Sequence, residues 1–181
     1  TQPDIRIDKD HFMIIAPDEG AADRSIYYAS MMGLDLGLFY KRRDYSTIVD
    51  GRNPIVAHEY LGDSVEGKDV LIPDDILATG ESMLDIAREL RRRKAGRVFL
   101  ATTFALFTKG YEVFDKAYED GLFDMLYSTN LTSLPPELKT RPWFTEVNVS
   151  KYISLLIATL NHDASISGLL NPGERIDALL A

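Results

Sequence analysis

The segment of residues 68–82, KDVLIPDDILATGES, constrains the fold of this chain more than any other. Its apolar run, residues 70–72, predicts a short buried strand, and two acids, Asp74 and Asp75, come directly after it. A loop of small residues follows, and behind it apolar residues recur with helical spacing at Met83, Ile86, Ala87 and Leu90. The order of strand, acidic pair, loop and helix predicts a phosphate site, because loop amides and the helix dipole both favour an anion there.

The rest of the chain alternates between expected strands and expected helices. The apolar runs predict strands at 12–16, 36–40, 55–61, 98–105, 125–128 and 144–149. The helical spacing predicts helices at 21–32, 111–119 and 150–160. We expect an α/β fold in which a parallel sheet is flanked by helices on both faces. A polar stretch, 44–53, predicts a flexible loop after the second strand, and residues 131–142 read as an irregular loop.

Composition excludes several classes of partner. The chain has 181 residues, which suits a single domain, and its formal net charge is −8. An acidic chain repels nucleic acid and anionic membranes, so we expect neither as a main partner. The chain has no cysteine, which suits a reducing cytoplasm and excludes disulfides and thiolate chemistry. No apolar run reaches the length of about 18 residues that a membrane span needs.

Charged residues follow two other expected strands at the edge of the sheet where ligands bind in this architecture. Asp18, in the turn after the first strand, is a candidate ligand for Mg²⁺, which prefers oxygen; the alternative is a helix cap. Lys41, Arg42 and Arg43 follow the second strand and enter the expected loop. They could close over phosphates as a cationic clamp, or they could be an ordinary solvated run of charge.

The acidic segment resembles the 5-phosphoribosyl 1-pyrophosphate (PRPP) motif of the type I phosphoribosyltransferase fold. Other segments occur in the order found in one branch of that fold, the ribose-phosphate pyrophosphokinases or PRPP synthases. These segments are a Pro-Asp-x-Gly turn, an arginine, a Lys-Arg-Arg run, the acidic motif, a Thr-Asn turn and a Ser-rich end. They lie at residues 17–20, 24, 41–43, 67–75, 129–130 and 165–170.

The resemblance implies transfer of a pyrophosphoryl group from ATP to the 1-hydroxyl of ribose 5-phosphate, with Mg²⁺. It implies that Asp74 and Asp75 hold the ribose hydroxyls and that residues 78–82 cradle the 5-phosphate: Ala78, Thr79, Gly80, Glu81 and Ser82. Asp18 would help to hold the Mg²⁺-bound sugar. Lys41 and Arg43 would stabilise the transferring phosphates as catalytic residues.

Three positions of the loop depart from the family pattern, Asp-Asp-x-x-Asp-Thr-Gly-Gly-Thr. Ala78 stands in place of the third Asp, Glu81 in place of a Gly and Ser82 in place of Thr. Glu81 is the most serious change, since a carboxylate about 5 Å from a phosphate charge costs about 3 kcal/mol at an effective dielectric of about 20. Its side chain could instead point away at the helix start, where acids are favoured. Further on, Phe104 and Ala105 stand where a His-Gly pair is common.

The resemblance also bears on domain organisation. Residues 1–181 read as one phosphoribosyltransferase-like domain, the C-terminal half of a longer two-domain chain, and the family forms homo-oligomers. We expect this domain alone to be inactive, because the adenine of ATP is taken largely through a preceding domain. Two alternatives stay open: a non-catalytic PRPP-synthase-like regulator, which Ala78 and Glu81 favour, and a phosphoribosyltransferase that acts on a base.

Overall fold

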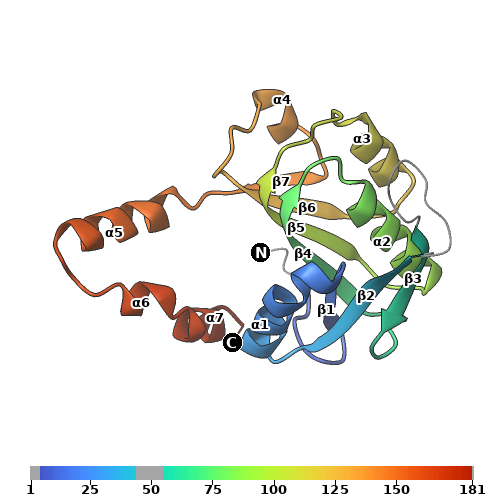
Figure 1. Cartoon of the computed structure of the whole chain (residues 1–181), viewed down its shortest axis with the longest axis horizontal. Coiled ribbons are helices and arrows are strands. Elements are labelled where there is room, and N and C mark those ends of the chain that lie inside the picture. The colour runs from blue at the N-terminus through green and yellow to red at the C-terminus, as the bar shows by residue number, and fades with distance from the viewer. Residues whose placement is uncertain (1–4, 44–54, 181) are drawn as a thin grey trace.

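The computed structural model describes residues 5–43 and 55–180 and contains one mixed sheet of seven strands (Figure 1). The strand order is β3-β2-β1-β4-β5-β6-β7, and all neighbours are parallel except β2 and β3, which are antiparallel. The strands are β1 (Phe12–Ala16), β2 (Asp35–Arg43), β3 (Ile55–Leu61), β4 (Asp69–Leu77), β5 (Val98–Ala105), β6 (Met125–Thr129) and β7 (Phe144–Val147). The predicted α/β class is confirmed, and the antiparallel edge strand is an addition to the expected parallel sheet.

Helices lie on both faces of the sheet, as expected for a parallel sheet whose strands need cover on each side. They are α1 (Ala22–Met32), α2 (Glu81–Arg92), α3 (Glu112–Glu119), α4 (Pro136–Lys139), α5 (Ser150–Asn161), α6 (Ser167–Leu170) and α7 (Gly173–Leu180), with a 3-10 turn, η1 (Glu19–Ala21), before α1. No helix in the described part of the chain is long and apolar enough to cross a membrane.

The core divides between the two faces because successive strand residues point to opposite sides. In β5, Val98 and Leu100 join the larger cluster beneath α2 and α3, whereas Phe99 joins a smaller cluster with Ala29 of α1. The four apolar positions predicted for the helix that follows the acidic segment, Met83, Ile86, Ala87 and Leu90, are all buried in α2. Aromatic rings fill the larger cluster around Trp143, which is 1 % exposed.

The structure corrects several predicted boundaries. β2 continues through Arg43, and β4 extends to Leu77, so the acidic pair lies within a strand rather than after it. The segment expected to be irregular contains the short helix α4, which Pro136 begins, because proline suits the first turn of a helix. The helical spacing in residues 111–119 predicts that Val113 faces inward, but its side chain is 41 % exposed. The predicted flexible loop, 44–53, lies outside the described residues.

Candidate functional site

The turn from β4 to α2 builds the predicted phosphate loop around one glycine. Gly80 precedes the first residue of α2 with φ of 81°, a conformation that side-chain-bearing residues rarely adopt. A Cβ added to Gly80 would lie 2.0 Å from Cζ of Phe114 in α3. Both the backbone angle and the space therefore require glycine. The turn leaves the first amides of α2 without intrahelical acceptors, at the positive end of its dipole.

A cavity of about 160 Å³ lies against this turn. Its wall contains two carboxylates, Asp18 from the turn after β1 and Asp74 from within β4, and most of the predicted loop: Ala78, Thr79, Gly80 and Ser82. The structure thus brings together six of the residues proposed from sequence. Asp75 and Glu81 do not line this cavity, although both are among the described residues.

Arg24 of α1 joins the two acids of β4. Its guanidinium lies 3.4 Å from Oδ1 of Asp74 and 3.1 Å from Oδ2 of Asp75. Asp75 also accepts a hydrogen bond from the amide of Ile76, at 2.8 Å, and its side chain is 59 % exposed. Asp75 is therefore open to a ligand from solvent, while Asp74 faces the cavity.

The two neighbouring carboxyls have pKa values that shift in opposite directions. Burial raises the pKa of Asp74 above its ordinary value; the hydrogen bond from the amide of Asp75 opposes this rise, and the nearby charges of Asp75 and Asp18 add to it. Burial acts in the same sense on Asp75, but the hydrogen bond from the amide of Ile76 and the charge of Arg24 outweigh it and leave the pKa of Asp75 lowered. Asp75 is thus the more firmly ionised member of the pair.

Asp18 fulfils the capping role that the sequence left open. Its carboxylate accepts a hydrogen bond from the amide of Ala21, at 3.2 Å, and caps the turn η1. It also lines the cavity together with Asp74. The described residues contain no group of three or more acidic, histidine or cysteine side chains placed to hold a metal. Two carboxylates on one cavity still fit Mg²⁺, which commonly binds through one or two carboxylates, water and substrate phosphates.

The side chain of Glu81 has a partner outside the cavity. Its Oε1 lies 2.7 Å from Nζ of Lys109, in the loop between β5 and α3. The backbone of this loop is tied to the phosphate loop, because the amide of Thr108 donates to the carbonyl of Ala78 at 2.9 Å. The carboxylate of Glu81, which was expected to weaken phosphate binding, is thus paired with a cation and does not line the cavity.

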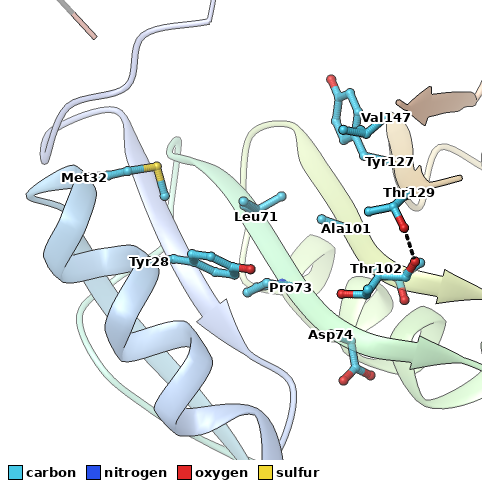
Figure 2. Close-up of a pocket in the computed structure, with 11 residues that line it drawn as sticks. Tyr28, Met32, Leu71, Pro73, Asp74, Ala101, Thr102, Tyr127, Thr129 and Val147 are labelled. Atoms are coloured by element: carbon cyan, nitrogen blue, oxygen red, sulfur yellow. Dashed lines mark hydrogen bonds between the residues drawn. The ribbon is translucent and has the colours of Figure 1, made fainter. Parts of the chain in front are cut away.

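A second cavity, of about 320 Å³, lies on the α1 side of the sheet and also has Asp74 at its margin (Figure 2). Figure 2 shows Tyr28 and Met32 projecting from α1 on one side of the cavity, with Tyr127 and Val147 on the far side. Its lining is mainly apolar, and Asp74 is its single charged residue among those described.

The structure adds a new candidate, Lys109, and a new role for Arg24. Arg24 was part of the sequence resemblance, but its pairing with both acids was not predicted. Lys109 comes after β5, which pairs with β4. Its position beyond the carboxyl end of a central strand was the sequence signal that could have identified it as a candidate.

Lys41 and Arg43 lie in the last residues of β2, opposite His58 and Ile55 of β3, and their side chains lie outside the described parts. Their predicted catalytic role stays a prediction.

Comparisons with known proteins concern the family and the fold of the chain. A model of the phosphoribosyl transferase domain matches residues 4–137. The chain is 28 % identical over 160 residues to a ribose-phosphate pyrophosphokinase of Vibrio cholerae, covering 88 % of this chain and 48 % of that protein. It is 38 % identical over 98 residues to one of Pyrococcus furiosus, covering 54 % and 33 %. The chain therefore spans about half the length of the Vibrio cholerae protein, and its match covers about one third of the Pyrococcus furiosus protein.

Among solved structures, the chain resembles the phosphoribosylpyrophosphate synthetase of Mycobacterium smegmatis. The TM-score is 0.69 at 18 % sequence identity, and the match covers 84 % of this chain and 46 % of the other. At this identity the likeness concerns the fold. The fold expected from the sequence motifs is therefore supported independently by this structural similarity.

Proposed function

Because this chain belongs to the phosphoribosyl transferase domain family, as a PRPP-synthase-like member, we propose that it binds ribose 5-phosphate at the turn between β4 and α2. The observation that carries the proposal is the 160 Å³ cavity, in which carboxylates face a glycine-dependent loop at a helix start. The carboxylates suit sugar hydroxyls, and the loop amides suit a phosphate. One ligand that carries both groups would satisfy both sides of the cavity.

In the proposed complex the carboxylates bind the sugar and the loop binds the phosphate. Asp74 accepts hydrogen bonds from ribose hydroxyls inside the cavity, and the exposed Asp75 does so from its mouth. The amides of the loop, with the hydroxyls of Thr79 and Ser82, take the 5-phosphate. Asp18 and Asp74 would hold Mg²⁺, which would supply positive charge to the phosphates of a bound nucleotide.

We propose that the complete protein is a ribose-phosphate pyrophosphokinase, with this chain as its ribose 5-phosphate side. The 1-hydroxyl oxygen of the sugar would form a bond to the β-phosphorus of ATP. The bond from that phosphorus to the oxygen shared with the α-phosphate would break, so AMP leaves and the hydroxyl proton is released. Lys41 and Arg43 would stabilise the charge on the transferring phosphates. Since the chain spans about half of its longer relatives, we expect no AMP from ATP and ribose 5-phosphate with this chain alone.

Calorimetric titration with ribose 5-phosphate, with and without Mg²⁺, tests the binding step. We expect a dissociation constant of roughly micromolar to millimolar size and loss of binding in the Asp75→Asn variant. Asp85→Asn is a matched control, because Asp85 is an exposed acid of α2 that pairs with Arg88 rather than lining the cavity. A folded wild-type chain that fails to bind, or equal loss in both variants, would overturn the proposal.

A further inference from the structure

The cavity of about 320 Å³ on the α1 side of the sheet combines an apolar floor with one polar end (Figure 2). The floor consists of Leu71, Pro73 and Ala101, which lie between Tyr28 and Tyr127 in the view. Tyr28 is 37 % exposed and Tyr127 is half-buried, so neither ring is closed to a ligand. A cavity of this size suits a small molecule, and aromatic side chains on opposite sides of an apolar floor favour a ring.

Two threonine hydroxyls at the polar end already have acceptors for their protons. Oγ1 of Thr102 donates to the carbonyl of Asp75 at 3.0 Å, and Oγ1 of Thr129 donates to the carbonyl of Thr103 at 2.6 Å. A hydroxyl has one proton and two acceptor lone pairs, so Thr102 and Thr129 can still accept hydrogen bonds. A ligand group that reaches them must therefore be a donor.

Asp74 adds a stronger acceptor to the same end of the cavity. The amide of Asp75, at 2.9 Å, and Arg24, at 3.4 Å, both donate to its Oδ1. A carboxylate has about four lone-pair sites, so Asp74 keeps the capacity to accept from a ligand. Arg24 is shared with Asp75, at 3.1 Å, and Asp18 adds a third carboxylate nearby. Three carboxylates and one guanidinium of the described chain thus leave this end of the cavity negative.

We propose that this cavity binds a flat aromatic molecule that carries a positively charged nitrogen group, such as an aromatic amidine or amine. The ring would lie on the apolar floor between Tyr28 and Tyr127. The N–H groups would donate to Asp74, Thr102 and Thr129. The described residues that line the cavity include no cation, so a ligand with a phosphate does not suit it. The proposal does not rest on ribose 5-phosphate binding, since the two cavities share Asp74 and no other described residue.

Titration followed by NMR compares three probes of similar shape: benzamidine, a cation; benzamide, which is neutral; and benzoate, an anion. We expect a dissociation constant of roughly millimolar size for benzamidine, as suits so small a ligand. Benzamidine should bind at least about tenfold more tightly than benzamide, and benzoate more weakly still, because charge-assisted hydrogen bonds to a carboxylate are the stronger ones. Equal affinities for benzamidine and benzamide would reveal a general apolar surface and overturn the assignment, as would the absence of benzamidine binding.

A pair of leucine variants locates the bound probe. Ala101→Leu enlarges a side chain of the apolar floor and should weaken benzamidine binding at least about tenfold, because the new side chain occupies the space of the ring. Ala158→Leu makes the same change at an exposed position of α5, outside the cavity lining, and should leave the affinity unchanged. Unchanged binding in Ala101→Leu, or equal losses in both variants, would overturn the location.

Asp74→Asn tests the charge without changing the shape of the cavity. This variant should lower the affinity for benzamidine to about that of benzamide and leave the affinity for benzamide unchanged. The dispersion of the amide signals shows whether each variant is folded. A folded Asp74→Asn variant that still prefers benzamidine about tenfold would contradict the role of Asp74.

Discussion

Lys109 and Glu81 place opposite charges beside the phosphate loop. Their pairing predicts that a substitution of Lys109 lowers the affinity for ribose 5-phosphate. Removing the ammonium in Lys109→Ala frees the carboxylate of Glu81 and leaves it uncompensated near the bound phosphate. We expect the affinity for ribose 5-phosphate to fall about three- to tenfold, since both groups are exposed and solvent screens them. Calorimetry with ribose 5-phosphate measures this change.

The double variant separates indirect from direct action of Lys109. If Lys109 acts through Glu81, Lys109→Ala combined with Glu81→Ala recovers most of the wild-type affinity, and Lys109→Arg keeps it. The affinity for neutral ribose should stay unchanged throughout, because the effect concerns the phosphate. A double variant as weak as Lys109→Ala alone would show that the lysine contacts the phosphate itself.

The opposite pKa shifts of the two acids predict opposite effects of pH on stability. The folded state raises the pKa of Asp74, so its ionised form costs stability above that pKa and the cost disappears in acid. Asp74→Asn should therefore increase the free energy of unfolding at pH 7 and give no increase below about pH 4. The folded state lowers the pKa of Asp75, so Asp75→Asn should decrease stability at pH 7 and have no effect once both states are protonated. Urea unfolding across pH 3 to 7 compares the two, and equal signs at pH 7 would contradict the assignment.

Gly80 lies in the phosphate loop and packs close to the buried ring of Phe114, so a substitution at Gly80 should destabilise the fold. In Gly80→Ala the new methyl group meets the ring of Phe114 at 2.0 Å, and the backbone keeps an unfavourable positive φ. We expect a loss of about 2–4 kcal/mol in unfolding free energy. Gly67→Ala is the control, since Gly67 also has positive φ but has no atom within 4 Å of an added Cβ. Urea unfolding should show a clearly smaller loss in that variant.

The sequence could predict which residues lie close together better than where their side chains point. The motif in residues 68–82 grouped Asp74, Thr79, Gly80 and Ser82, and all four line one cavity, because local sequence order determines a strand–loop–helix turn. It could not show that Glu81 leaves the cavity, because its partner Lys109 is 28 residues away in the sequence. Long-range pairs of charged side chains depend on how strands are arranged in the sheet, and strand spacing alone does not contain that information.

At the level of helices and strands, Asp115 of α3 connects its helix to the segment before β7. Its Oδ1 accepts hydrogen bonds from Nε1 of Trp143 at 2.7 Å and Nε of Arg141 at 2.9 Å. Asp115→Ala leaves the buried indole N–H without this acceptor. We expect a loss of about 2–3 kcal/mol in urea unfolding.

Two variants test whether this loss belongs to the connection rather than to the helix. Asp115→Asn keeps an oxygen for Trp143 but loses the charge toward Arg141, so its loss should be smaller. Glu112→Ala alters an exposed acid in the same first turn of α3 and should change stability by less than about 0.5 kcal/mol. Equal losses in Asp115→Ala and Glu112→Ala would indicate an effect on helix α3 itself.

The elements were predicted well where a periodic pattern was strong and less well at their ends. β1, β3 and β5 have the predicted bounds, because each is an apolar run between polar turns. α4 was missed because its four residues give no helical period to detect. The direction of β3 was also missed, since side-chain alternation is the same in parallel and antiparallel strands.

At the scale of the whole molecule, the sequence predicted the composition of the layers but not which surface they leave open. The pattern in residues 150–160 identified an apolar helix, and a helix of that kind is expected to cover a sheet. In the structure α5 instead lies away from the sheet (Figure 1), and none of its residues is buried. The cavities of about 160 Å³ and 320 Å³ share a boundary at Asp74, which lines both. A molecule in the larger cavity would therefore contact one side of the acid that we place beside the ribose.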